Sequence, residues 1–167
     1  MALRQVLLYP DARLKQKCLP TDPCCELTQS IAHDLLDTMD AGPPRTVGIA
    51  APQIGEMVRV IVVDTSRNPK YPGSHGLLTL VNPEITAAAR QQVFREGCLS
   101  LPDFTANITR HDEITVKGFS LNGQVITLTT TGFESVVLQH EIDHLNGILF
   151  LDRVAHVKTD LFRRKTI

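Results

Sequence analysis

The pattern H-E-x-x-H at residues 140–144 constrains this chain more than any other stretch, because it lies in a segment with the apolar residues of a buried helix. On a helix, His140 and His144 lie one turn apart on the same face, where both imidazoles can bind one metal ion. Glu141 then stands beside that ion and can take a proton from water. The alternative is a helix that carries two histidines by chance. Burial disfavours it, because unpaired imidazoles and carboxylates are costly away from water.

Length and charge narrow the class of protein. The chain has 167 residues, with 17 Lys plus Arg against 18 Asp plus Glu. This length supports a sizeable core, and no Pro/Gly/Ser-rich run divides it, so we expect a single domain over residues 1–167. A net charge near zero gives no reason to expect nucleic acid or an anionic membrane as the main partner. The sequence shows neither a signal peptide nor an apolar run of about 20 residues, so we expect a cytoplasmic protein.

The cysteines predict thiol chemistry rather than disulfides. Cys18, Cys24, Cys25 and Cys98 lack the spacing of a secreted disulfide scaffold, and adjacent cysteines rarely bridge each other. We therefore expect reduced thiols, one of which has a working role.

The remaining pattern predicts a mixture of helices and strands. Apolar residues recur every four positions from Glu26 to Asp40, which predicts an amphipathic helix. The metal helix is expected to begin near Gly132, and a basic helix is expected from Lys158 to Lys165. Strands are predicted at residues 58–64, 77–81, 85–94 and 148–151, and a hairpin at 113–117 and 125–130 around Leu121-Asn122-Gly123.

Two further stretches suggest a site. Residues 47–55 are rich in small side chains that let a ligand approach the backbone closely. Cys98 stands between a glycine and a leucine, and a buried cysteine is by itself usually a small hydrophobe. A zinc-like centre needs three protein ligands, so the histidine pair requires a third ligand from elsewhere in the chain.

Three stretches in this order resemble the signature motifs of the peptide deformylase family. They are G-I-A-A-P-Q at residues 48–53, E-G-C-L-S at 96–100 and Q-H-E-I-D-H at 139–144. The resemblance implies an α+β fold with small antiparallel sheets packed around a central metal-binding helix. It also implies a hydrolase that removes the N-formyl group from the formyl-methionine of new polypeptides and releases formate.

The resemblance also implies roles for individual residues. It gives Cys98, His140 and His144 as metal ligands and ferrous iron as the metal, although this ligand set also suits zinc, nickel or cobalt. Glu141 is the implied general base and then acid, while the side-chain amide of Gln53 and the backbone N–H of Leu99 stabilise the developing oxyanion. The implied substrate groove consists of Val47, Gly48, Phe94, Glu96, Phe133, Val136 and Val137. Glu96 and Arg110 are further expected to form an ion pair that braces the cysteine loop.

This chain departs from the family pattern at two positions near the groove. Thr46 stands where the family usually has glycine, and Glu134 stands where a small or apolar residue is common. Both departures leave the metal ligands and Glu141 unchanged. We therefore expect them to affect substrate preference and turnover first, and the chemistry of the site less. The implied partners are N-formylmethionyl nascent peptides and, through a basic tail with Lys158 and residues 163–165, the bacterial ribosome.

Two other functions fit parts of the sequence. A metallopeptidase of the H-E-x-x-H kind cuts internal amide bonds, but it usually recruits its third ligand downstream, where His156 is the only later histidine. A degenerate relative would only bind N-formylated peptides or store the metal. Formate release from a formyl-methionyl peptide, compared with cleavage of an unmodified peptide, separates these hypotheses.

Overall fold

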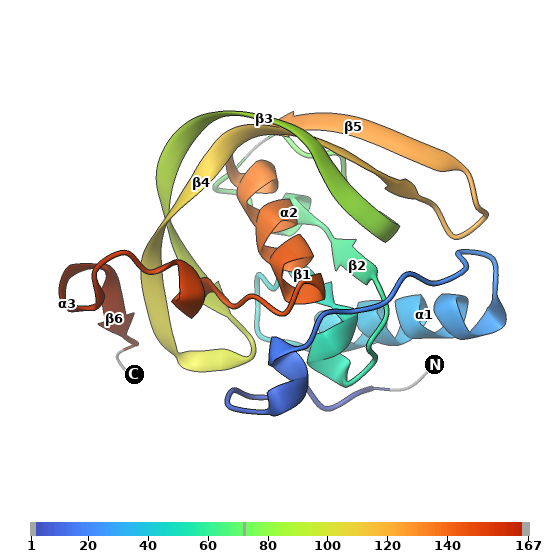
Figure 1. The fold of residues 1–167 in the computed structure, drawn as a ribbon, viewed down its shortest axis with the longest axis horizontal. Coiled ribbons are helices and arrows are strands. Elements are labelled where there is room, and N and C mark those ends of the chain that lie inside the picture. Colours follow the sequence, from blue (N-terminus) through green and yellow to red (C-terminus); the bar gives the residue numbers. More distant parts are fainter. Residues whose placement is uncertain (1–2, 72, 165–167) are drawn as a thin grey trace.

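A central helix and a bent antiparallel sheet dominate the computed structural model, which describes residues 3–71 and 73–164 (Figure 1). The sheet arches around helix α2 (Gly132–Leu145), and its strands follow the order β1-β2-β3-β4-β5, with β6 paired to β4. The predicted α+β class is therefore confirmed. The strands join in one six-stranded sheet, where the resemblance implied several small ones.

The element bounds match the main predicted segments. The helix predicted from Glu26 to Asp40 is α1, and α2 begins at Gly132 as expected. No helix within residues 3–71 and 73–164 is long and apolar enough to cross a membrane. The third helix is α3 (Val157–Asp160), and the strands are β1 (Gly48–Ala50), β2 (Val60–Val63), β3 (Leu78–Cys98), β4 (Leu101–Phe119), β5 (Val125–Thr131) and β6 (Leu161–Arg163).

Strand β2 is buried on both faces, which explains its unbroken apolar sequence. Val60 and Val62 pack in a cluster with α1, whereas Ile61 and Val63 pack in a cluster with α2. The β1–β2 pair is thus held between the two helices. This arrangement fixes Gly48, at the start of β1, beside the polar face of α2.

Helix α2 is buried along nearly its whole length, because every residue from 134 to 145 is buried. Its last carbonyl groups have no partner within the helix, and the Leu145 carbonyl accepts from the Cys18 N–H at 2.9 Å. The buried guanidinium of Arg59 also donates to the Leu145 carbonyl at 3.2 Å and to Asn146 Oδ1 at 2.9 Å. A cation at this end of the helix also complements the helix dipole.

The strands predicted at 77–81 and 85–94 are one continuous strand, β3, so the predicted break was wrong. Pairing with β4 shifts register between Val81 and Glu84, and Asn82 takes a left-handed conformation with φ 51°. Pro83 has no N–H to donate, and the irregularity places it where the ladder is already interrupted. The β4–β5 hairpin around Gly123 is present as predicted.

Two predictions near the C-terminus were also wrong. Residues 148–151 are not a strand: Leu149 and Phe150 are buried in a cluster with Leu14 and Cys98, and a 3-10 helix spans Phe150–Arg153. The apolar run therefore reflects burial and not pairing. The predicted basic helix is helical only over Val157–Asp160, after which the chain forms β6; Lys165 lies outside the described residues.

Candidate active site

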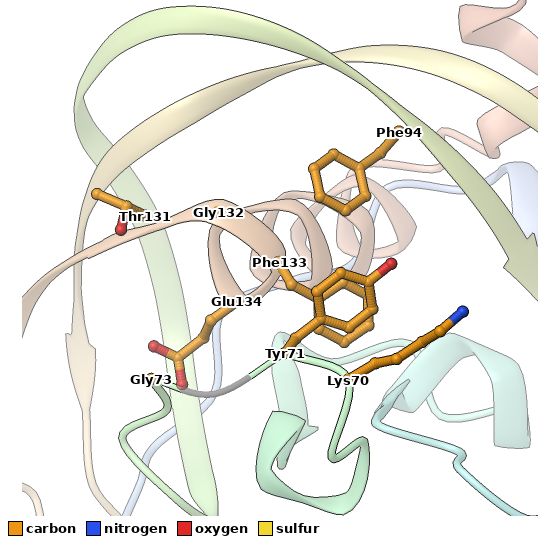
Figure 2. Close-up of a pocket in the computed structure, with 8 residues that line it drawn as sticks. All are labelled: Lys70, Tyr71, Gly73, Phe94, Thr131, Gly132, Phe133 and Glu134. Atoms are coloured by element: carbon orange, nitrogen blue, oxygen red, sulfur yellow. The ribbon is translucent and has the colours of Figure 1, made fainter.

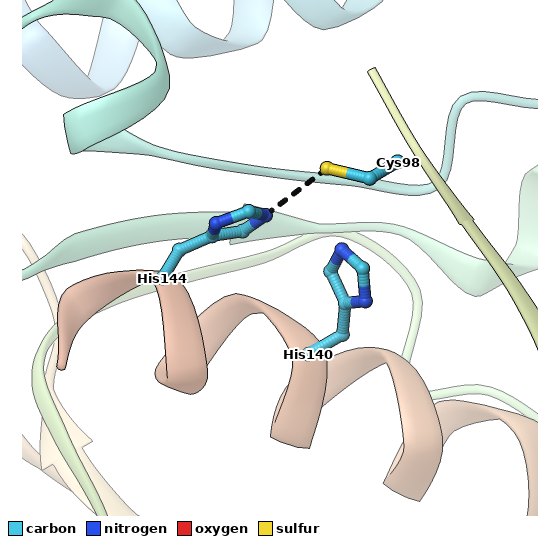
Figure 3. Close-up of side chains that lie close together, drawn as sticks. All are labelled: Cys98, His140 and His144. Atoms are coloured by element: carbon cyan, nitrogen blue, oxygen red, sulfur yellow. Dashed lines mark hydrogen bonds between the residues drawn. The ribbon is translucent and has the colours of Figure 1, made fainter. Parts of the chain in front are cut away.

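Cys98, His140 and His144 come together in a buried cluster (Figure 3). The cysteine ends β3, and the two histidines project from adjacent turns of α2. Their candidate ligand atoms all lie within 4.8 Å of one another, and Cys98 Sγ is 3.3 Å from His144 Nε2. All three side chains are buried, so a charged group placed here meets little competition from water.

The donor set and its surroundings fit a metal ion. His140 donates its Nδ1–H to Glu96 Oε2 at 2.7 Å, which leaves Nε2 available as a ligand. A carboxylate behind a histidine orients the ring and increases its basicity toward a metal. A thiolate with two imidazoles is a ligand set found in catalytic zinc sites and suits other divalent transition metals.

Glu96 is fully paired. Arg110 donates to its two carboxylate oxygens at 2.6 and 3.0 Å, so the expected ion pair is present and both partners are buried. Arg110 also donates to Asp143 at 2.5 Å, and Arg153 binds the same carboxylate. Burial alone raises the pKa of Glu96, but the hydrogen bonds from Arg110 and His140 outweigh it and lower the pKa to about 2.

Glu141, unlike Glu96, has a carboxylate oxygen without a hydrogen-bond partner among the described residues. This oxygen, Oε2, is buried. Burial raises the pKa of this carboxyl to about 7. The carboxylate lies against β1: a Cβ built on Gly48 would stand 2.6 Å from Glu141 Oε1. An unpaired carboxylate with a pKa near neutrality is suited to accept and return a proton.

Gln53 reaches the site from a 3-10 helix, Ala51–Ile54, that follows β1. Its Oε1 accepts from the Ala50 N–H at 2.9 Å, which orients the amide so that Nε2 faces the site. Nε2 lies 3.6 Å from Cys98 Sγ and 3.1 Å from Ser100 Oγ. Ser100 belongs to the second motif, yet sequence reasoning gave it no role.

A cavity of about 600 Å³ opens onto these groups. Its lining includes Cys98, His140, Glu141 and Gln53, whereas His144 is not part of the lining. Leu99 also lines it. All seven residues expected in the substrate groove line it as well: Val47, Gly48, Phe94, Glu96, Phe133, Val136 and Val137.

Three aromatic rings line this cavity and also line the smaller cavity drawn in Figure 2. Tyr71 stacks on Phe133 with ring centroids 4.1 Å apart, and Phe94 stands 6.0 and 6.2 Å from those two rings. They border a second cavity of about 300 Å³. Sequence reasoning missed Tyr71, because its loop showed only turn-forming residues.

Comparison with known proteins decides what kind of enzyme carries this geometry. Residues 3–160 match the family model of polypeptide deformylase. A peptide deformylase of Thermodesulfovibrio yellowstonii is 40% identical, over 99% of this chain and 97% of that protein. The chain belongs to the polypeptide deformylase family. Family membership makes it a metal-dependent hydrolase that removes the N-formyl group from newly made polypeptides.

Solved structures of the family agree with this fold. One is the crystal structure of a peptide deformylase from Legionella pneumophila, which is 39% identical in sequence and superposes with a TM-score of 0.83. The match covers 94% of this chain and 89% of that chain. The peptide deformylase of Thermotoga maritima is 30% identical with a TM-score of 0.83, over 93% and 100% of the two chains.

The two departures from the deformylase pattern have local partners. The buried carboxylate of Glu134 accepts from the His75 N–H at 2.8 Å and from Thr130 Oγ1 at 2.7 Å, and it pairs with His75 Nδ1 at 2.6 Å. It thereby fastens the loop that carries Tyr71 to the start of α2. Thr46 donates its hydroxyl to the Pro43 carbonyl at 2.7 Å, within the turn after α1.

Proposed function

We propose that Cys98, His140 and His144 hold the metal and that Glu141 is the general base and acid of deformylation. The observation that carries this proposal is the buried, unpaired Glu141 carboxylate next to three converging ligand atoms. A bound divalent metal supplies a Lewis acid that lowers the pKa of water and polarises the formyl group.

The chain's own groups then perform the proton transfers. Glu141 accepts a proton as water attacks the formyl carbon, and it returns the proton to the departing amine. Negative charge grows on the formyl oxygen, where the Gln53 amide and the Leu99 backbone N–H donate hydrogen bonds. Removing one such donor typically slows an enzyme by about 10²- to 10³-fold.

We propose that the groove holds the formyl-methionine by its backbone and its side chain. Gly48 lies on the edge strand β1, where its backbone groups can pair with an extended peptide. Val47, Val136 and Val137 line the groove beside it, as does Glu96, whose carboxylate is occupied by Arg110 and His140. The apolar rings of Phe94 and Phe133 suit a thioether side chain, since sulfur packs favourably against aromatic rings.

We propose ferrous iron as the native metal, from the family resemblance and from a thiolate-containing ligand set. Zinc, nickel and cobalt are the competing occupants. Metal analysis of protein purified without oxygen tests this assignment, because an iron-loaded site oxidises at the metal and at Cys98 in air. A protein purified with zinc and stable in air contradicts it.

Formate release is the direct test of the proposed site. Metal-loaded protein should release formate from a formyl-methionyl peptide and leave the internal bonds of an unmodified peptide intact. Cleavage of the unmodified peptide would support the metallopeptidase alternative. Binding without turnover would support the degenerate relative.

We also propose that the enzyme works in the bacterial cytoplasm and binds the ribosome weakly. The support is chemical, because nascent formylated chains emerge there and because Lys158 and Arg163 are exposed cations on the tail. Replacing both with glutamine should reduce co-sedimentation with ribosomes at low salt. Unchanged co-sedimentation would remove the ribosome from the proposal.

A further inference from the structure

The C-terminal segment returns to the active-site groove. Strand β6 pairs with β4 through Leu161↔Ala106, Phe162↔Thr105 and Arg163↔Phe104 (Figure 1). One residue further, the Arg164 N–H donates to the Asp103 carbonyl at 2.7 Å. The tail is therefore a short edge strand, and it carries Arg164 to the rim of the cavity that contains the metal ligands.

Arg164 is seated over Gly97, the residue before the metal ligand Cys98. A Cβ built on Gly97 would stand 2.2 Å from Arg164 Nη2, so the guanidinium fills the space that a side chain would need. Gly97 and Cys98 have Cα atoms about 3.8 Å apart, so the guanidinium of Arg164 lies close to a metal ligand.

Two more arginines line the same cavity. Arg95 stacks over the ring of Phe162, with its guanidinium carbon 3.5 Å from the ring centroid, and donates to Asn107 Oδ1 at 2.9 Å. Arg45 stands on the turn after α1. Within the described part of the chain, Arg45, Arg95 and Arg164 form no ion pair with a carboxylate.

Among the residues that the structure describes, Glu96 and Glu141 are the only acidic side chains that line this cavity. Glu96 is paired with both Arg110 and His140, and Glu141 lies against Gly48 on β1. The three arginines without carboxylate partners among the described residues therefore make this part of the lining cationic. Such an arrangement attracts carboxylates rather than ammonium groups.

Resting on the proposed function, we propose that Arg164, with Arg95 and Arg45, binds carboxylate side chains on the residues that follow the formyl-methionine. The chain should therefore deformylate acidic N-terminal sequences faster than neutral or basic ones. Arg164 is the specificity-determining contact, and β6 positions it.

Peptide amides with one variable residue test this proposal. We would compare kcat/KM for formyl-Met-Ala-Glu-amide, the Gln and Lys analogues, and formyl-Met-Ala-Gln with a free C-terminal carboxylate. The Glu peptide should exceed the Gln peptide by about two- to fivefold, which is the range of an exposed ion pair, and salt should reduce the ratio. The Lys peptide should be slowest.

The matched variants are Arg164→Gln and Arg163→Gln, which remove the same charge from adjacent residues of the tail. Arg163 does not line the cavity, so its variant should keep the Glu-to-Gln ratio, whereas Arg164→Gln should bring it close to one. Equal rates for the Glu and Gln amides in the unmodified protein would overturn the proposal. A ratio unaffected by Arg164→Gln would do the same, as would a preference confined to the free C-terminal carboxylate.

Binding of the same peptides to Glu141→Gln protein, measured by calorimetry, separates this proposal from the proposed catalytic roles. If the native protein released no formate from any peptide while Glu141→Gln protein bound the Glu peptide more tightly, only the catalytic assignment would be contradicted. If the native protein released formate but Glu141→Gln protein showed no binding preference, only the role of Arg164 would be contradicted.

Discussion

Glu96 and Glu141 are two buried carboxylates in one site, and their surroundings move their pKa values in opposite directions. Glu96 receives hydrogen bonds from Arg110 and His140 and has a pKa of about 2. Glu141 has an oxygen without a partner among the described residues, and its pKa is about 7. Burial acts on both, so hydrogen-bond partners make the difference. A permanently charged carboxylate orients a ligand, whereas one that titrates near neutrality can carry a proton.

Removing the titrating carboxylate should have the largest effect. Glu141→Gln keeps the shape of the side chain but cannot accept a proton, so kcat/KM for deformylation should fall by about 10²- to 10⁴-fold. Metal content should stay unchanged. Both are measured on the same preparation, by formate release and by metal analysis. Near-normal turnover in a metal-loaded variant would refute the assignment of Glu141 as the base.

The second largest effect should follow the removal of Arg110, the partner of the charged carboxylate of Glu96, and should appear in stability. Arg110→Met leaves Glu96 buried with less compensation, and we expect the free energy of unfolding to fall by about 3–5 kcal/mol. Urea denaturation measures it. Lys15→Met is the control, because Lys15 and Asp152 form an exposed pair whose loss should cost at most about 1 kcal/mol. Adding Glu96→Gln to Arg110→Met should recover part of the loss; no recovery would mean that packing, not charge, set the effect.

Cys18 tests outside the site whether burial raises a pKa by more than a neighbouring cation, Arg59, lowers it. Burial raises the pKa of this thiol to about 11 from an ordinary value near 9. Because the protonated form is favoured in the fold, its stabilisation is complete below about pH 9 and is lost as the pH rises through 11. Unfolding free energy should fall by about 1–2 kcal/mol more between pH 8 and 11 in the native protein than in Cys18→Ala. If the unfolding free energies of the native protein and of Cys18→Ala fell equally with pH, the raised pKa of Cys18 would be contradicted.

Glu134, in the first turn of α2, is a further buried carboxylate to set beside Glu96 and Glu141, and its removal should have a smaller effect. Its carboxylate is satisfied like Glu96, but its partner His75 lies on the loop that carries Tyr71. Glu134→Gln weakens that attachment, so KM for formyl-methionyl peptides should rise by about two- to tenfold while kcat changes less than twofold. Steady-state kinetics measure both. Tyr71→Ala should reproduce the KM effect; a change in kcat alone would show that Glu134 acts on the chemistry instead.

The sequence predicted the parts of this molecule that depend on short-range patterns. Two histidines four residues apart must share a face of a helix, so that part of the site followed from the helical period. The amphipathic period likewise located α1 with its observed bounds, although Leu27, the first apolar residue of that period, is exposed.

Contacts made by distant pairing escaped prediction. Strand β6 is three residues long and carries no alternating pattern, so nothing local indicated that it would place Arg164 at the groove. The apolar run at 148–151 fits a strand and a buried turn equally well, because periodicity cannot distinguish short buried segments. Tyr71 stacks on Phe133 from a loop that the His75–Glu134 pair attaches to α2, a contact between segments about 60 residues apart.

The contact between Gly48 and Glu141 limits how this enzyme can be redesigned. Any side chain at position 48 would meet the carboxylate that we assign as the base, since a Cβ there would lie 2.6 Å from it. A library that widens or narrows the groove by varying β1 would therefore damage turnover whenever it touches this position. Productive variation must come from other residues of the lining, such as Tyr71, Phe94 or Arg164, where new side chains can alter the choice of substrate without replacing Gly48.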